Sequence, residues 1–180
     1  MKYGNLILLI LSAGSMIGLQ GCLRDDVSFV VDTRAEMVIP SGLSPDRNLI
    51  LDQQVFFPYS VQLDVNNVEE ENVESVNGVL GLAFPQFGAV SDLSFISEIE
   101  IDVLDPTNTT LSGREIFHYV QRDFRRLSDI DLTPSLPDVK DLIRDDVLLL
   151  RIEVSFNIPP PTTFTMLYDL QLGVFEVEEM

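Results

Sequence analysis

The stretch ISEIEIDVL, residues 96–104, alternates apolar and acidic side chains more regularly than any other part of the chain. In an extended backbone Ile99, Ile101 and Val103 face one side, and Glu98, Glu100 and Asp102 face the other. Alternation of apolar and polar side chains with a period of two is typical of a strand that is buried on one face and exposed to solvent on the other. The stretch therefore predicts a half-buried β-strand.

Similar runs occur on both sides of this stretch, and turn residues such as Pro, Gly, Asp and Asn separate them. No alternation of strands with long helices is visible. We therefore predict a mainly β protein, an immunoglobulin-like antiparallel β-sandwich with one or two short helices, with a small β-barrel as the alternative. The expected strands are Val27–Val31, Leu49–Phe57, Val61–Val65, Ile96–Leu104, Glu115–Gln121, Ser128–Leu132, Val147–Asn157 and Phe164–Val177.

Two segments favour short helices. Residues 66–77 have a possible cap at Asn67, acidic residues in the first turn and Gly78 as a stop. Residues 138–143 could form one helical turn or two.

Charge limits the classes of partner. The chain has 11 Lys and Arg against 29 Asp and Glu, a formal net charge of −18. This balance argues against nucleic acid, which needs a basic surface, and favours cationic partners or simply a solvated acidic surface. Because 46% of the residues are hydrophobic, the chain should still fold.

The first residues form an export signal. Lys2 precedes an apolar run, Leu6–Ile17, and a cleavage region, Leu19–Gly21, follows with a small residue just before Cys22. About a dozen apolar residues are too few for a comfortable membrane span, which needs ~20. We predict a signal peptide over residues 1–21, a short tether over 22–26 and a single domain over 27–180.

The exit of this signal, Leu19-Gln20-Gly21-Cys22, resembles the lipobox of bacterial lipoprotein precursors. The resemblance implies cleavage between Gly21 and Cys22 and lipidation of Cys22 by a diacylglycerol and a further acyl chain such as palmitate. Leu23 follows the cysteine, and an aspartate does not, so the resemblance implies the outer membrane of the cell envelope. The alternative is an ordinary signal peptide that leaves one buried cysteine.

The sequence contains few residues or motifs that could support catalysis. His118 is the single histidine, and the chain has no G-x-S-x-G elbow, phosphate-binding loop or paired-histidine zinc motif. His118 should lie on the strand face opposite Phe117 and Tyr119, in a structural or solvent-facing role. We predict a protein that is not an enzyme and uses no cofactor.

Acidic clusters give the rival hypothesis, a calcium-dependent hydrolase. The weak metal candidates are Asp138, Asp141, Asp145 and Asp146. The row formed by Glu98, Glu100 and Asp102 would also need cations opposite it, and Arg151 and Lys140 are possible partners.

The sequence also contains one cluster of basic residues, with aromatic residues next to them. Arginine and aromatic side chains are typical anchors of interfaces, and a weak partner-binding site is predicted at Tyr119, Arg122, Phe124, Arg125 and Arg126. Alternatively, these arginines neutralise the acidic rows. The expected function is a lipid-anchored, non-catalytic envelope protein that holds an envelope protein or polymer near the membrane.

Overall fold

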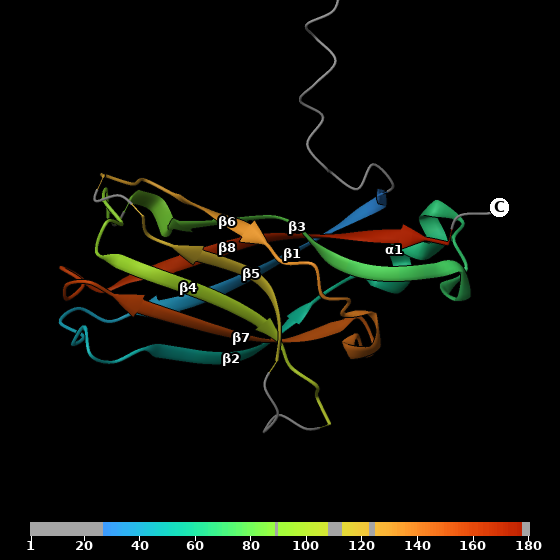
Figure 1. Cartoon of the computed structure of the whole chain (residues 1–180), viewed down its shortest axis with the longest axis horizontal. Coiled ribbons are helices and arrows are strands. Elements are labelled where there is room, and N and C mark those ends of the chain that lie inside the picture. Colours follow the sequence, from blue (N-terminus) through green and yellow to red (C-terminus); the bar gives the residue numbers. More distant parts are fainter. Residues whose placement is uncertain (1–26, 89, 108–112, 123–124, 178–180) are drawn as a thin grey trace, which may run out of the picture.

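The computed structural model describes residues 27–88, 90–107, 113–122 and 125–177 and shows a mainly β protein (Figure 1). Its strands are β1 (Val27–Ile39), β2 (Leu49–Phe56), β3 (Val73–Pro85), β4 (Ile96–Val103), β5 (Arg114–Val120), β6 (Ile130–Pro134), β7 (Val147–Phe156) and β8 (Phe164–Glu176). One α-helix, α1 (Tyr59–Asn66), and three 3-10 turns, η1 (Glu70–Asn72), η2 (Gln86–Gly88) and η3 (Lys140–Leu142), connect them within the described residues.

The strands form one antiparallel sheet in the order β1-β8-β3-β6-β5-β4-β7-β2. The sheet curls until its end strands, β1 and β2, face each other, so it is nearly closed into a barrel. The immunoglobulin-like sandwich is therefore not confirmed, and the small barrel, which the sequence left as the alternative, fits. The prediction of a mainly β protein is confirmed.

Two junctions hold this curled sheet together. On one side, β5 and β6 share a ladder of two residue pairs. On the other side lies the seam, the gap between β1 and β2. There the Thr33 hydroxyl donates to the Phe56 carbonyl at 2.8 Å. The Gln53 amide, turned so that its nitrogen faces the Glu36 carbonyl, pairs with both backbone groups of Glu36 at 3.3 Å.

The core lies inside the curl, as the alternating patterns predicted. Ile99, Ile101 and Val103 of β4 are fully buried. On the neighbouring strand β7, every second side chain from Leu148 to Phe156 is buried. The matching period of adjacent strands gives the sheet one apolar face, and burial of that face drives the curl.

Residues 61–65 are helical, so the predicted strand there is wrong. In α1, Tyr59 and Leu63 are buried one turn apart, whereas Val61 and Val65 are exposed. The carboxylate of Asp146 accepts hydrogen bonds from the Ser60 amide at 2.7 Å and from its hydroxyl at 2.5 Å. A carboxylate at the free amides of a first turn stabilises a helix that the local pattern alone does not indicate.

The short helix predicted over residues 66–77 is also wrong in the main. Asn67 is the left-handed C-cap of α1 rather than an N-cap, with φ 55°. Only η1 is helical in this range, and β3 begins at Val73. Gly78 lies inside β3 beside a bulge. The turn predicted over residues 138–143 is confirmed as η3.

Two glycines let β3 cross an aromatic ring of β5. A Cβ on Gly78 would lie 2.6 Å from the Ile116 carbonyl oxygen and 3.1 Å from the Phe117 ring. A Cβ on Gly81 would lie 2.9 Å from the Leu132 Cβ. Phe117, fully buried, therefore packs against bare backbone.

Candidate functional site

A hollow lies where β5 and β6 part. Their ladder consists of Phe117 opposite Pro134 and His118 opposite Thr133. The residues that would pair next instead border a hollow of about 280 Å³, called here the β5–β6 hollow. Its wall includes Tyr119, Val120, Arg122 and Arg125 on the β5 side and Asp129 and Asp131 on the β6 side.

The structure thus brings three of the five predicted partner-binding residues, Tyr119, Arg122 and Arg125, to one hollow. Arg126 is turned elsewhere, since its guanidinium donates to the Ser91 hydroxyl at 3.0 Å. Phe124 lies outside the described residues.

The segment after the hollow is fixed to a neighbouring turn. The Leu93 amide donates to the Leu127 carbonyl at 2.7 Å, and the Leu127 amide donates to the Asp92 carboxylate at 3.3 Å. Backbone hydrogen bonds from Ser94 and Leu127 lower the pKa of Asp92, and Arg126 adds to this effect. The charged carboxylate therefore anchors one side of the hollow.

The charges in the hollow are mixed. Arg122 and Arg125 are exposed, and neither forms an ion pair with any residue that the structure describes. Burial raises the pKa of the Tyr119 phenol, while Arg125 opposes the rise. A phenol next to two guanidinium groups that have no described ion-pair partner can accept an anionic group and stack on an apolar or planar one.

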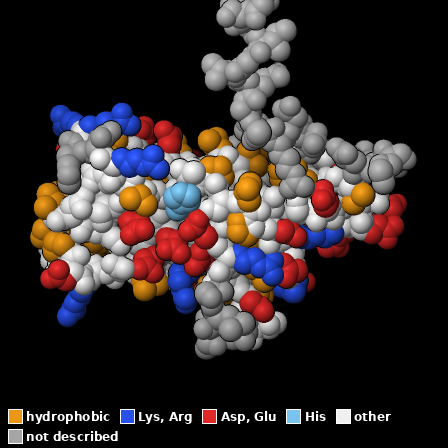
Figure 2. Space-filling model, in the orientation of Figure 1, with side chains coloured by type: hydrophobic (Ala, Val, Ile, Leu, Met, Phe, Trp, Pro, Cys, Tyr) orange, Lys and Arg blue, Asp and Glu red, His pale blue; other side chains and the backbone are white. Residues whose placement is uncertain are grey.

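The acidic row lies on the outer face of β4, and its first residue, Glu98, lies opposite Val120 at the edge of the β5–β6 hollow. Figure 2 shows Asp and Glu side chains gathered near the middle of the face in view. Glu100 lies opposite His118 on β5 and opposite Glu153 on β7. Burial, followed by repulsion from Asp102 and other neighbouring carboxylates, raises the pKa of Glu100. Burial and Glu115 likewise raise the pKa of Asp102.

The sequence suggested two cationic partners for this row, and the structure places one of them, Arg151, beside it. Arg151 lies opposite Asp102 but forms its hydrogen bonds, both 2.7 Å, with Asp52. Lys140 is elsewhere, where its ammonium donates to the carbonyls of Glu70 and Val73. The prediction for Lys140 is therefore wrong, and the row keeps an excess of negative charge.

His118 has a serine and a carboxylate beside it, but not in triad geometry. Its Nδ1 lies 3.1 Å from Glu115 Oε1 and 3.3 Å from Ser135 Oγ. The serine also donates to the same glutamate oxygen. In a catalytic triad the serine and the carboxylate contact opposite ring nitrogens. Here they share one, so this cluster does not prepare Ser135 as a nucleophile.

The four aspartates proposed for calcium serve separate contacts. Asp138 accepts the amides of Val76 and Lys140, and Asp141 pairs with Arg114, which lowers the pKa of Asp141. Asp146 binds Ser60, and Asp145 has a left-handed backbone, φ 50°. In the part of the chain that the structure describes, no three His, Cys, Asp or Glu side chains gather closely enough to hold a metal ion.

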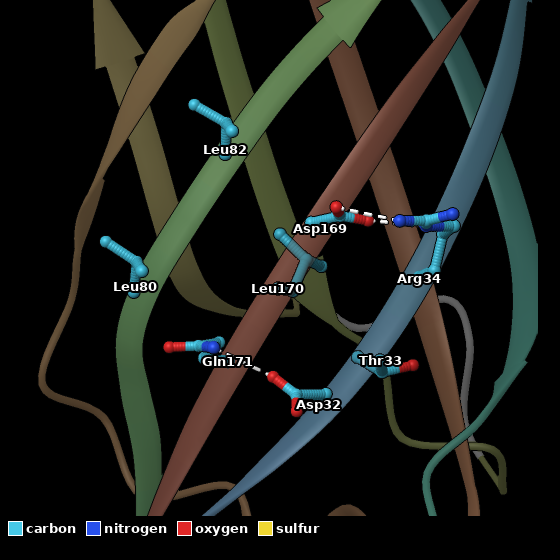
Figure 3. A pocket seen from close by; sticks show the side chains of 8 residues that line it. All are labelled: Asp32, Thr33, Arg34, Leu80, Leu82, Asp169, Leu170 and Gln171. Carbon is cyan, nitrogen blue, oxygen red and sulfur yellow. Dashed lines mark hydrogen bonds and ion pairs between the residues drawn. The ribbon is translucent and has the colours of Figure 1, made fainter. Parts of the chain in front are cut away.

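Sequence reasoning missed an open trough on the outer face of β1, β8 and β3, about 450 Å³ in volume (Figure 3). Arg34 binds Asp169 at 2.8 Å, and the Gln171 amide donates to Asp32 at 2.9 Å. Leu80 and Leu82 border the other side. These polar groups come from strands more than a hundred residues apart, so only the register could reveal their pairing.

The lipidation and cleavage residues, Cys22 and Gly21, lie outside the described residues. No helix in the described part is both long and apolar enough to cross a membrane. No protein-family model, curated protein or solved structure matches this chain.

Proposed function

We propose that this chain is a lipid-anchored protein of the bacterial cell envelope whose β domain binds a partner and carries out no catalysis. The resemblance of Leu19–Cys22 to a lipobox supports the anchor, and Leu23 in place of an aspartate after the cysteine supports the assignment to the outer membrane. Two acyl chains hold a protein on a bilayer far better than one, because each buried CH₂ contributes ~0.8 kcal/mol.

The observation that carries the binding role is the β5–β6 hollow. It combines an aromatic side chain with two guanidinium groups that have no described ion-pair partner, at a place where the sheet itself is interrupted. Arginine and tyrosine are frequent hot spots of protein interfaces. The shared use of one ring nitrogen at His118 disfavours hydrolysis by a serine nucleophile.

The anchor is tested by fractionation of cells that express the chain or its Cys22→Ala variant. The unaltered chain should sediment with membranes and incorporate labelled palmitate, and the variant should do neither. A variant that stays in the membrane fraction would contradict the lipid anchor.

Binding is tested with a photo-reactive amino acid at Val120, which borders the hollow and is 53% exposed. The control position is Ile50 on β2, which is 54% exposed. We expect a discrete cross-linked product in intact cells from position 120 and none from position 50. Equal products from both positions, or none from either, would contradict a binding role for the hollow.

A further inference from the structure

A second hollow, about 420 Å³ in volume, lies at the end of the molecule where Figure 1 places α1. Three segments that are distant in the sequence border it: the start of α1, the turn η1 and the turn before β7. It is called here the Tyr59 hollow, and its lining residues are Tyr59, Ser60, Glu70, Ile143, Asp145 and Asp146. It shares no lining residue with the β5–β6 hollow.

Hydrogen bonds tie the walls of the Tyr59 hollow together. The Asp146 carbonyl accepts the Phe57 amide at 2.8 Å, and the Asp146 carboxylate accepts the Ser60 amide at 2.7 Å. On the side of η1, the Lys140 ammonium donates to the Glu70 carbonyl at 2.8 Å. The hollow is therefore formed by the fold itself, as small-molecule sites usually are.

The hydroxyl of Tyr59 is buried beside this hollow without a hydrogen-bond partner. Tyr59 is only 4% exposed, and its ring stacks on Phe57 with the centroids 6.2 Å apart. Burial, followed by the charges of Glu70 and Asp138, raises the pKa of the phenol to about 12. Since Glu70 lines the hollow as well, the phenol end of the ring is the end that borders it. Nearly all buried polar groups are hydrogen-bonded, so this hydroxyl points to a group that binds there.

The charged groups that line the hollow are all acidic. Glu70 and Asp145 are exposed, and neither carboxylate has a hydrogen-bond or ion-pair partner among the residues that the structure describes. Two bases contact the surrounding turns but do not line the hollow. Lys140 binds the Glu70 carbonyl, and Arg144 binds the Ile143 carbonyl at 2.9 Å. The lining itself thus lacks a positive group.

The spacing of the carboxylates does not suit a metal ion, because no three His, Cys, Asp or Glu side chains of the described residues gather closely enough to coordinate one. An alkylammonium group is less demanding. Its three N–H donors bind separate acceptors, and its carbon chain packs on apolar surface. The hollow offers acceptors at Glu70, Asp145 and the Tyr59 hydroxyl, and apolar surface at Ile143.

We propose that the Tyr59 hollow binds an alkylammonium group, whose charge Glu70 and Asp145 balance and whose N–H donates to the Tyr59 hydroxyl. Such a group is carried by small amines and by the lysine side chains of proteins. The volume of the hollow lies within the range of small-molecule sites. This site is additional to the β5–β6 hollow and does not depend on the binding role proposed for it.

Binding is tested by the amide NMR shifts of the full-length, isotope-labelled chain in a neutral detergent. The probe is n-butylammonium, and n-butanol is the uncharged control of the same shape. We expect n-butylammonium to move the signals of Ser60 and Asp146 to saturation, with a dissociation constant on the order of 1 mM, and n-butanol to leave them in place. Absence of a saturable shift with the amine would overturn the inference.

A second probe, Nα-acetyl-lysine methylamide, identifies the source of the ammonium group. Saturable shifts with both amines would support the site and assign it to lysine side chains of a partner. Shifts with n-butylammonium alone would support the site and assign it to a small amine. A saturable shift of the same signals with calcium would assign the hollow to a metal ion and overturn the inference.

Three variants test the residues. Tyr59→Phe removes the hydroxyl but keeps the charge and the stacked ring, and it should weaken binding about tenfold. Glu70→Gln and Asp145→Asn should each weaken it about three- to fivefold. Asparagine tolerates the left-handed backbone of Asp145, φ 50°. Tyr59→Phe should not lower the melting temperature, because the hydroxyl has no partner to lose.

Glu71→Gln is the matched control, since Glu71 adjoins Glu70 but does not line the Tyr59 hollow. A chain with net charge −18 attracts any cation, and this variant measures that general attraction. Equal weakening by Glu71→Gln and Glu70→Gln, or unchanged binding in Tyr59→Phe, would show diffuse attraction and overturn the inference. Because cross-linking from position 120 reports on the other hollow, the two proposals can fail separately.

Discussion

Gly78 and Gly81 occupy positions that any other side chain would obstruct. The Ile116 carbonyl and the Phe117 ring press directly on the backbone of β3 there. A core this dense tolerates little additional volume. The obstruction at Gly78 involves backbone, which cannot rotate away.

We therefore expect Gly78→Ala to lower the free energy of unfolding by about 1–3 kcal/mol, as overpacking does. The matched control is Gly173→Ala, whose nearest obstacle, at 2.6 Å, is a side-chain methyl group of Val79 and not backbone. Urea unfolding measures both. Equal losses would show that the Ile116 carbonyl moves as readily as the Val79 methyl.

Glu100 should make the stability of the fold depend on pH. Burial and neighbouring carboxylates raise its pKa in the folded state above the ordinary value of 4.5. The folded chain then binds more protons than the unfolded chain between these two values, so stability falls as the pH rises through that range. At neutral pH the full penalty is present.

Glu100→Gln should accordingly raise stability at neutral pH by a few tenths to about 1 kcal/mol and flatten the fall above pH 4.5. Glu36→Gln is the control, because Glu36 is exposed on β1 and lies opposite Leu167. Thermal melting at several pH values gives the comparison. A fall in stability on replacing Glu100 would mean that its charge is favourable in the fold.

The residues of the candidate site were only partly predictable. Tyr119, Arg122 and Arg125 are close in the sequence, so the sequence alone could group them. Asp129 and Asp131 could not be placed beside them, because this requires the point at which β5 and β6 part. The contact of Asp146 with Ser60 spans 86 positions and leaves no local signal.

At the scale of elements, the seam is the place where β1 and β2 are joined by side chains. The Gln53 amide takes the role that a backbone peptide of a paired strand would have, since it binds both the N–H and the C=O of Glu36. An unpaired strand edge invites pairing with other chains. The amide thus covers part of that edge.

Gln53→Met should remove this cover while keeping the shape of the side chain. We expect the Glu36 amide to exchange with deuterium at least about tenfold faster, as local protection is lost. Gln54→Met is the matched control, because Gln54 is exposed and adjacent. Exchange that is unchanged in the Gln53 variant would contradict the amide pairing across the seam.

Elements with strong alternation were predictable, and the region around α1 was not. β4 and β7 each bury one face over their length, so their pattern decides their structure. Val61–Val65 alternates as well, yet packing of Tyr59 and Leu63 and the Asp146 carboxylate favour a helix. Over five residues, tertiary contacts outweigh the local pattern.

At the scale of the whole molecule, the alternation of apolar and polar residues and the positions of turn residues indicate strands. They do not indicate how the sheet closes. A sandwich and a barrel bury the same alternate residues. Only the strand order, with the consecutive strands β1 and β2 at its two ends, separates the two architectures.

The net charge of −18 predicts a general response to salt. Added NaCl should raise the melting temperature, because screening reduces the repulsion within the folded molecule. Millimolar calcium should raise it no more than magnesium at the same concentration, since the described residues contain no gathered set of metal ligands. A specific calcium shift that a chelator reverses would revive the hypothesis of a calcium-dependent hydrolase.

The position of β8 between β1 and β3 has a consequence in time. The ladder of β1 can form only after β8 has been synthesised, and β3 pairs with β8 as well. Contacts between such distant parts of a chain form slowly, because a long loop must close before they stabilise anything. During synthesis β1 and β3 therefore remain without their common neighbour until β8, residues 164–176, has emerged. We therefore expect the stable fold to form only late in synthesis, once β8 can pair with both of its neighbours.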